Sequence, residues 1–248
     1  MPRSILAAAV LAALTVASAP TFAAQVEAFQ NATVQPGGVR TGGSGINFFN
    51  IEGTDFGNFA SYGVARFDVS AAKAEFDAAY GAGQWLVASV TLRLTQANAA
   101  FTADGGVNVY FTGDDSVALT APSPLRYDAT KSPSFAPNFS DAAFLTSYQF
   151  REVSSGTVED YSLYALPIAG IPAANALADD IRNDNIVTLV LADGTAGVAA
   201  TYAGFNNNTY AGPTLVILAA PVPEPETYAL LGAGLLLVGG ARALRRRG

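Results

Sequence analysis

The chain has 248 residues, a formal net charge of −7, and neither cysteine nor histidine. The missing residue types exclude Ser-His and Cys-His nucleophile systems and histidine-based zinc sites. The acidic balance argues against nucleic acid as a partner, because phosphate binding needs a cationic surface.

The first 23 residues have the composition of a secretory signal peptide. Arg3 gives a basic start, an apolar run extends from Ile5 to Val16, and small residues follow. Cleavage after Ala23 is the preferred prediction, and cleavage after Ala24 is the alternative. An uncleaved anchor is disfavoured, because the apolar run is shorter than the ~20 residues of a spanning helix. We therefore expect signal peptidase to process this end.

Residues 24–219 are predicted to form one β-rich domain. The clearest strand covers residues 86–95, where alternation places Leu86, Ala88, Val90, Leu92 and Leu94 on one face. Residues 107–112 alternate in the same way, and residues 63–70 point positions 65, 67 and 69 inward. Two apolar runs, 185–193 and 213–220, are typical of central strands. Weaker strands are expected at about 25–34, 144–153, 157–165 and 197–203.

Two short helices interrupt the strands. Ser70 is predicted to cap a helix over residues 71–80, and Gly81 is predicted to end it. Pro172 can open a second helix that runs to about Arg182.

Aromatic residues in two loop regions are candidate sugar contacts. Residues 120–141 contain four prolines, and a loop of this length without regular structure is usually functional or mobile. The stretch 202–210 is rich in asparagine. Their rings could stack on a glycan, although such rings more often bury loop edges. The candidates are Tyr127, Phe135, Phe139, Tyr202, Phe205 and Tyr210.

The acidic residues do not predict a metal site. Calcium needs six to eight oxygen ligands, and no DxDxDG loop is present. We therefore expect solvated turns and no cofactor, with a structural calcium ion near Glu52 and Asp55 as the alternative. The densest acids are Asp114, Asp115, Asp179, Asp180 and Asp184.

Many short strands joined by Gly, Pro and Asn turns predict an all-β fold, an antiparallel β-sandwich of jelly-roll type with two short helices. The order of "VARFDVS", "VASVTLRL", "VNVY", "IVTLVLAD" and the closing "PTLVI" is similar to DNRLRE-type jelly-roll domains. This resemblance implies kinship with carbohydrate-binding modules of secreted proteins. Trp85, at a strand start, does not by itself indicate sugar stacking.

The C-terminal tail has three parts. Residues 220–226 are a proline-rich linker in which Pro223 and Pro225 hold Glu224 in an extended, accessible backbone. The uncharged segment Thr227–Ala241 has 15 residues, and as a helix it would measure about 22 Å against a hydrocarbon core of about 30 Å. The basic residues of the final stretch, which favour the cytoplasmic side, are Arg242, Arg245, Arg246 and Arg247.

This tail resembles the PEP-CTERM sorting signal, with Pro223-Glu224-Pro225 as its motif. The resemblance implies a transient inner-membrane anchor over residues 227–248, processing by an exosortase, and transfer to the cell surface or extracellular matrix. An ordinary single-pass anchor is the alternative. We therefore expect a non-catalytic surface or matrix protein associated with exopolysaccharide or biofilm. A carbohydrate-binding module is the first alternative, and a polysaccharide-active enzyme is the less favoured one.

Overall fold

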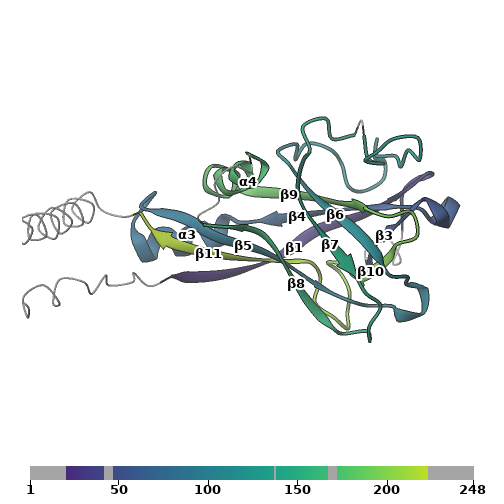
Figure 1. The fold of residues 1–248 in the computed structure, drawn as a ribbon. Coiled ribbons are helices and arrows are strands. Elements are labelled where there is room, and N and C mark those ends of the chain that lie inside the picture. Colours follow the sequence, from purple (N-terminus) through teal and green to yellow (C-terminus); the bar gives the residue numbers. More distant parts are fainter. Residues whose placement is uncertain (1–20, 42–46, 137, 167–171, 223–248) are drawn as a thin grey trace, which may run out of the picture.

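The computed structural model describes residues 21–41, 47–136, 138–166 and 172–222 (Figure 1). The expected C-terminal sorting helix lies outside these residues. The elements, in chain order, are β1 (Phe22–Gln35), β2 (Gly38–Val39), β3 (Phe48–Glu52), η1 (Thr54–Phe59), β4 (Tyr62–Asp68), α3 (Ser70–Tyr80), β5 (Trp85–Thr95), η2 (Ala99–Phe101), β6 (Gly105–Thr112), β7 (Ala143–Phe150), β8 (Val158–Ala165), α4 (Pro172–Asn183), β9 (Ile186–Asp193), β10 (Ala199–Ala203) and β11 (Thr214–Pro221).

Nine strands form one antiparallel sheet that rolls up until it is nearly closed. The strand order is β7-β6-β9-β4-β1-β11-β5-β8, with β2 added to β1. A bulge at Phe29 divides β1, so that its first half pairs with β11 and its second half with β4. The end strands β7 and β8 meet where the rings of Tyr148 and Tyr161 stack, with centroids 3.7 Å apart. The expected all-β antiparallel class is confirmed, while this strand order does not by itself establish a jelly roll.

Strand β5 shows an error in the predicted alternation. A register shift with β11 lies between Leu218 and Ala219 and leaves Ala88 without a partner. This bulge reverses the inward face, because side chains on a strand alternate with period two. Trp85 and Val87 are buried before the bulge, and Val90, Leu92 and Leu94 are buried after it. Leu86 and Ala88 are therefore only partly buried, not core residues.

The two helices lie where the sequence predicts them, with one correction at a cap. α3 includes Ser70, whose backbone amide donates to the carboxylate of Asp68 at 3.0 Å. The side chain of Asp68, rather than that of Ser70, therefore accepts a hydrogen bond from a free amide in the first turn. Gly81 ends α3 with φ 93°, as expected. α4 buries one face against the core, through Ala173, Ala174, Leu177, Ala178 and Ile181.

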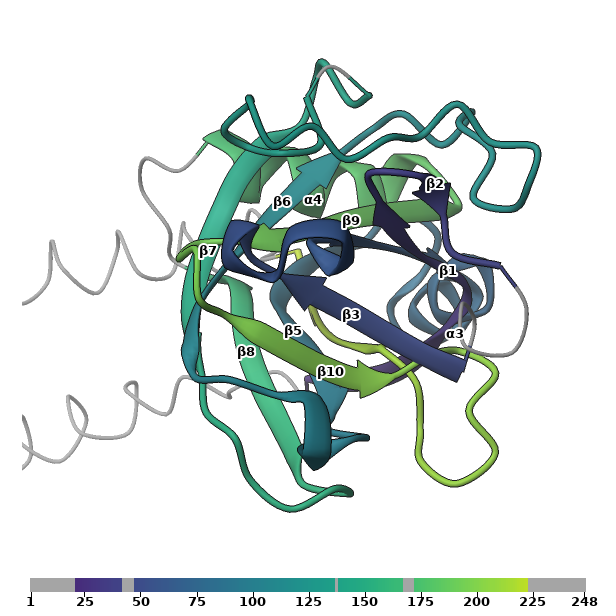
Figure 2. The same ribbon diagram turned by 90° about the vertical axis from the view of Figure 1, so that its right-hand side faces the viewer.

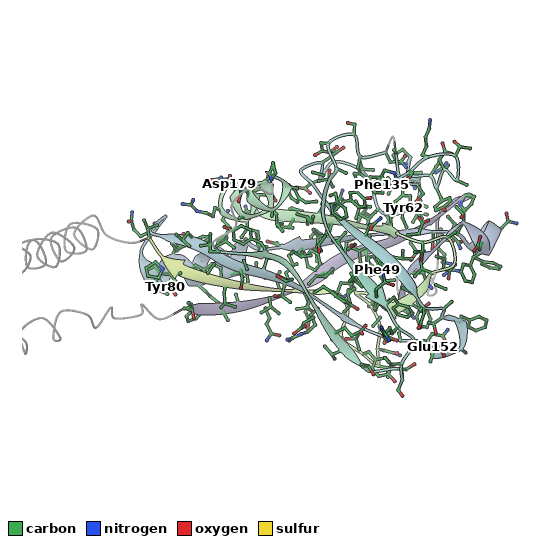
Figure 3. The ribbon with its side chains drawn as sticks, viewed as in Figure 1. Phe49, Tyr62, Tyr80, Phe135, Glu152 and Asp179 are labelled. Carbon is green, nitrogen blue, oxygen red and sulfur yellow. The ribbon has the colours of Figure 1, made fainter. Side chains whose placement is uncertain are left out.

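The proline-rich segment is a packed cover, not an open loop. It runs along one face of the sheet (Figures 1 and 2), where Leu125 and Phe135 are almost fully buried. Figure 3 shows Phe135 beside Tyr62, and their ring centroids are 5.9 Å apart. The second hydrophobic cluster, called here the outer cluster, comprises Ala32, Val34, Ala60, Tyr62, Val64, Leu119, Leu125, Tyr127, Phe135, Phe139, Val190 and Ala192.

The main core lies inside the rolled sheet and is closed by the ribbon of β3 and β10. Figure 2 shows this ribbon crossing in front of the sheet, on the side away from α3. Phe49 and Ile51 of β3 and Tyr202 of β10 are fully buried in the main core. Because the sheet is covered on both sides, Val64 of β4 is as buried as its neighbour Ala65.

Candidate functional site

The last strand of the domain lies in the middle of the sheet. β11 pairs with β1 on one side and β5 on the other, with Phe22 opposite Ala219 and Pro221 opposite Trp85. The first strand, β1, and the last strand, β11, are antiparallel neighbours, and the start of β1 lies opposite the end of β11. Both ends of the described chain therefore lie at one end of the domain (Figure 1). The tail therefore begins beside the position where the predicted signal peptide ends.

The fold holds the chain up to the residue before the tail motif. The backbone amide of Val222 donates to the carbonyl of Gln84 at 2.9 Å. The hydroxyl of Tyr80, at the same end of the molecule in Figure 3, donates to the carbonyl of Ala219 at 3.1 Å. Pro223, the first motif residue, thus follows a hydrogen-bonded residue directly. Sequence reasoning missed this junction, since nothing local marks Gln84 or Tyr80 as its partners.

Trp85 anchors this end of the domain. Its indole nitrogen donates to the carboxylate of Asp77 at 2.7 Å, and its ring packs on Phe76 with centroids 5.1 Å apart. The hydrogen bond from Trp85, followed by one from the Gly83 amide, lowers the pKa of Asp77. Trp85 is only 3% exposed, so its ring faces are not open to a sugar.

The predicted signal cleavage falls inside β1. Ala23 and Ala24 pair with Leu218 and Ile217. A cut after Ala23 removes two of the six register pairs between β1 and β11 and leaves the four from Ala24 to Glu27. The removed Phe22 is 43% exposed and touches Phe76 edge-on at 6.3 Å. The strand pairing therefore survives the predicted cut.

The structure corrects the proposed glycan contacts. Tyr127, Phe135 and Phe139 belong to the outer cluster, and each is at most 5% exposed. Tyr202 is fully buried in the main core and shares a 3.0 Å hydrogen bond with the hydroxyl of Tyr148. These four rings have no free face for a sugar, because tight packing covers them. Phe205 and Tyr210 are only partly buried.

The fold brings three of the predicted acids together. Burial, with Asp115 and Asp184 nearby and Lys73 opposing, raises the pKa of Asp180 to about 7. Burial also raises the pKa of Asp115, against a hydrogen bond from Thr188 and the charge of Arg66. One Asp180 carboxylate oxygen is buried without a hydrogen-bond partner.

Glu52 and Asp55 do not form a joint site. Glu52 is 7% exposed and accepts from the side-chain amide of Asn50 at 3.3 Å, whereas Asp55 is exposed. Burial raises the pKa of Glu52, with the charge of Arg40 opposing. Among the residues described, no three His, Cys, Asp or Glu side chains are grouped to hold a metal ion.

A shallow pocket of about 560 Å³ lies elsewhere, lined by residues 35–41 and Asn58. Arg40 is the one charged residue among those that line it, and its guanidinium also donates to Asn50 at 3.2 Å. No acidic side chain lines this pocket, so it does not combine with the carboxylate cluster around Asp180.

Comparison with known families finds one match. Residues 221–247 match the PEP-CTERM protein-sorting motif, a range that contains Pro223, Glu224, Pro225 and the basic tail. No curated protein matches the chain. The motif implies export to the cell surface or extracellular space, a tail transiently associated with the membrane, and processing by an exosortase. In the part of the chain that the structure describes, no helix is long and apolar enough to span a bilayer.

Proposed function

We propose that this protein is a non-catalytic component of the cell surface or extracellular matrix, delivered by its C-terminal tail. The observation that carries the proposal is the sorting motif, which follows the folded domain with no intervening loop. The domain forms a complete packed unit up to Val222, so removal of the tail leaves its strands intact. Residues 227–248 then serve only as a temporary anchor.

The absence of enzymatic activity is part of the same proposal. The sequence lacks histidine and cysteine, which leaves carboxylate pairs or a serine–lysine pair as its catalytic options. Lys73, one of two lysines in the chain, donates instead to the backbone carbonyl of Asp184 and the side chain of Asn185. The carboxylate cluster around Asp180 is the remaining candidate for a polysaccharide-active enzyme, and it lies away from the pocket.

We further propose that the protein associates with the host's exopolysaccharide. The alternative is that the domain is a carbohydrate-binding module. The similarity of the strand motifs to DNRLRE-type jelly-roll domains supports that alternative. Phe205 and Tyr210 are the candidate rings that retain exposed surface. Titration of the domain with exopolysaccharide, followed by calorimetry, tests it. A flat titration would remove the binding module and leave the sorting function standing.

Intact mass of the exported protein tests the sorting function. We expect a chain that starts at Ala24, or one residue later, and stops close to Pro225. Glu224→Ala should leave the tail uncut, whereas Glu226→Ala is the matched control, an acid next to the motif. A secreted protein that retains Arg245 to Arg247 would contradict the proposal.

A further inference from the structure

The end of the domain that holds both chain termini carries an apolar rim, defined here as Phe22, Leu166 and Val222. Their exposed fractions are 43%, 47% and 40%. The rim surrounds the start of β5, because the Leu166 amide donates to the Ala88 carbonyl at 2.8 Å and the Val222 amide donates to Gln84. A contiguous patch of exposed apolar side chains usually marks a contact with another protein or with a membrane.

The tether between this rim and the tail is short. Four residues, Pro223 to Glu226, separate Val222 from the uncharged segment that begins at Thr227. Val222 and Thr227 are five residue steps apart, and an extended chain covers at most about 3.6 Å per step, so the tether spans no more than about 18 Å. The headgroup region of one leaflet takes up roughly 5–8 Å of that distance. Val222 must therefore lie within roughly 10–13 Å of the lipid headgroups while the tail is inserted.

The apolar segment is too short to leave slack on the side of the domain. Fifteen residues span about 22 Å as a helix, which is shorter than a hydrocarbon core of about 30 Å. Such a mismatch is relieved by thinning the bilayer and by pulling flanking residues towards it. The basic residues can snorkel on the opposite side, so the apolar segment adds no length to the tether at Val222.

We propose that, before processing, the apolar rim rests on the lipid bilayer, with Leu166 and Val222 in the headgroup region. This inference depends on the proposed sorting function, because it requires an inserted tail. The signal peptide carries Phe22 away, so Leu166 and Val222 make the contact in the anchored form. The opposite end of the domain, near Glu152 in Figure 3, then faces away from the membrane. Exosortase would meet its motif at the membrane surface, directly beside the rim.

Single-cysteine labelling tests the proposal, because the natural chain contains no cysteine. Leu166→Cys places an environment-sensitive fluorophore on the rim. Phe101→Cys is the matched control, since Phe101 is 73% exposed and lies on η2, whose Ala99 amide contacts Ser155 near the far end. The chain without its predicted signal peptide, residues 24–248, is reconstituted in phosphatidylcholine vesicles that carry nitroxide-labelled headgroups, and flotation reports insertion of the tail.

The expected result is flotation with a loss of fluorescence at position 166 and no loss at position 101. A Gly-Ser spacer of about ten residues after Val222 should restore the fluorescence at 166 while flotation persists, because a flexible spacer frees the domain. Flotation with no loss at 166, or with equal loss at both positions, would overturn the proposal and leave the sorting function intact. Failure to float would overturn both.

Discussion

The backbone amide of Val222 donates to the carbonyl of Gln84 at 2.9 Å, and the next residue, Pro223, is the first of the sorting motif. A peptide bond in a hydrogen-bonded segment is harder to bring into a protease active site than one in a loose linker. A cut at the motif would therefore fall within a few residues of the folded domain. The end of β11 is the part of the fold that lies nearest to the motif.

Removing β11 should abolish folding, whereas removing the tail should not. Truncation after Pro213 deletes the strand between β1 and β5 and takes the fully buried Leu215 and Ile217 out of the core. Truncation after Val222 is the matched control and leaves every described strand in place. Urea unfolding followed by the fluorescence of Trp85, the single tryptophan, should be cooperative only for the control. A cooperative transition in the shorter chain would contradict the central role of β11.

The stacked pair of Tyr148 and Tyr161 should hold the edges of the rolled sheet together. Tyr161→Ala removes a ring from this contact, and we expect a loss of about 2–4 kcal/mol in the free energy of unfolding. Tyr161→Phe keeps the ring and loses the 2.7 Å hydrogen bond to Glu159, so it should cost only about 1 kcal/mol. Equal losses in the two variants would show that the stacking does not stabilise the seam.

Phe135 should be a stability residue rather than a ligand contact. It is 1% exposed and packs edge-to-face on Tyr110, with centroids 4.9 Å apart. Phe135→Ala should lower the free energy of unfolding by about 3–5 kcal/mol. Phe101→Ala, on an exposed ring, should change it by no more than about 0.5 kcal/mol. Chemical denaturation of both variants measures this, and unchanged stability in Phe135→Ala would reopen a functional role for the loop.

Asp180 should make the folded state less stable as the pH rises. Its pKa is about 7 in the folded protein, above the ordinary value of 3.8, chiefly because of burial and then because of Asp115 and Asp184. Between these two values the folded state holds a proton that the unfolded state has released, so stability falls as the pH rises and levels off above about pH 7.

Asp180→Asn should make that slope shallower, giving a protein more stable than the natural one at pH 8 and little changed at pH 4. Asp115 and Glu52, whose pKa values burial also raises, keep their own share of the slope. Asp179→Asn, an exposed neighbour on α4, is the control and should keep the natural profile. Thermal unfolding between pH 4 and 8 measures both. A slope that is unchanged in Asp180→Asn would assign the loss of stability with rising pH to another group.

The sequence alone determined much of the local structure of this protein and its sorting signal. Apolar patterns located every strand except β2 and β3, and Pro172 and Gly81 marked helix boundaries. The prolines, apolar segment and arginines of the tail identified the sorting signal. These features depend on neighbouring residues, so one chain is enough to reveal them.

Only the tertiary structure decided which surfaces are covered. The bulge at Ala88 follows from pairing with β11, more than 120 residues away, and it reverses the face that Leu86 occupies. The burial of Tyr127 and Phe135 depends on where the proline-rich segment lies across the sheet. The grouping of Asp115 with Asp180 and the attachment of Val222 to Gln84 likewise join distant segments. A periodic pattern predicts that a side chain is buried, but long-range pairing decides which residues pack against it.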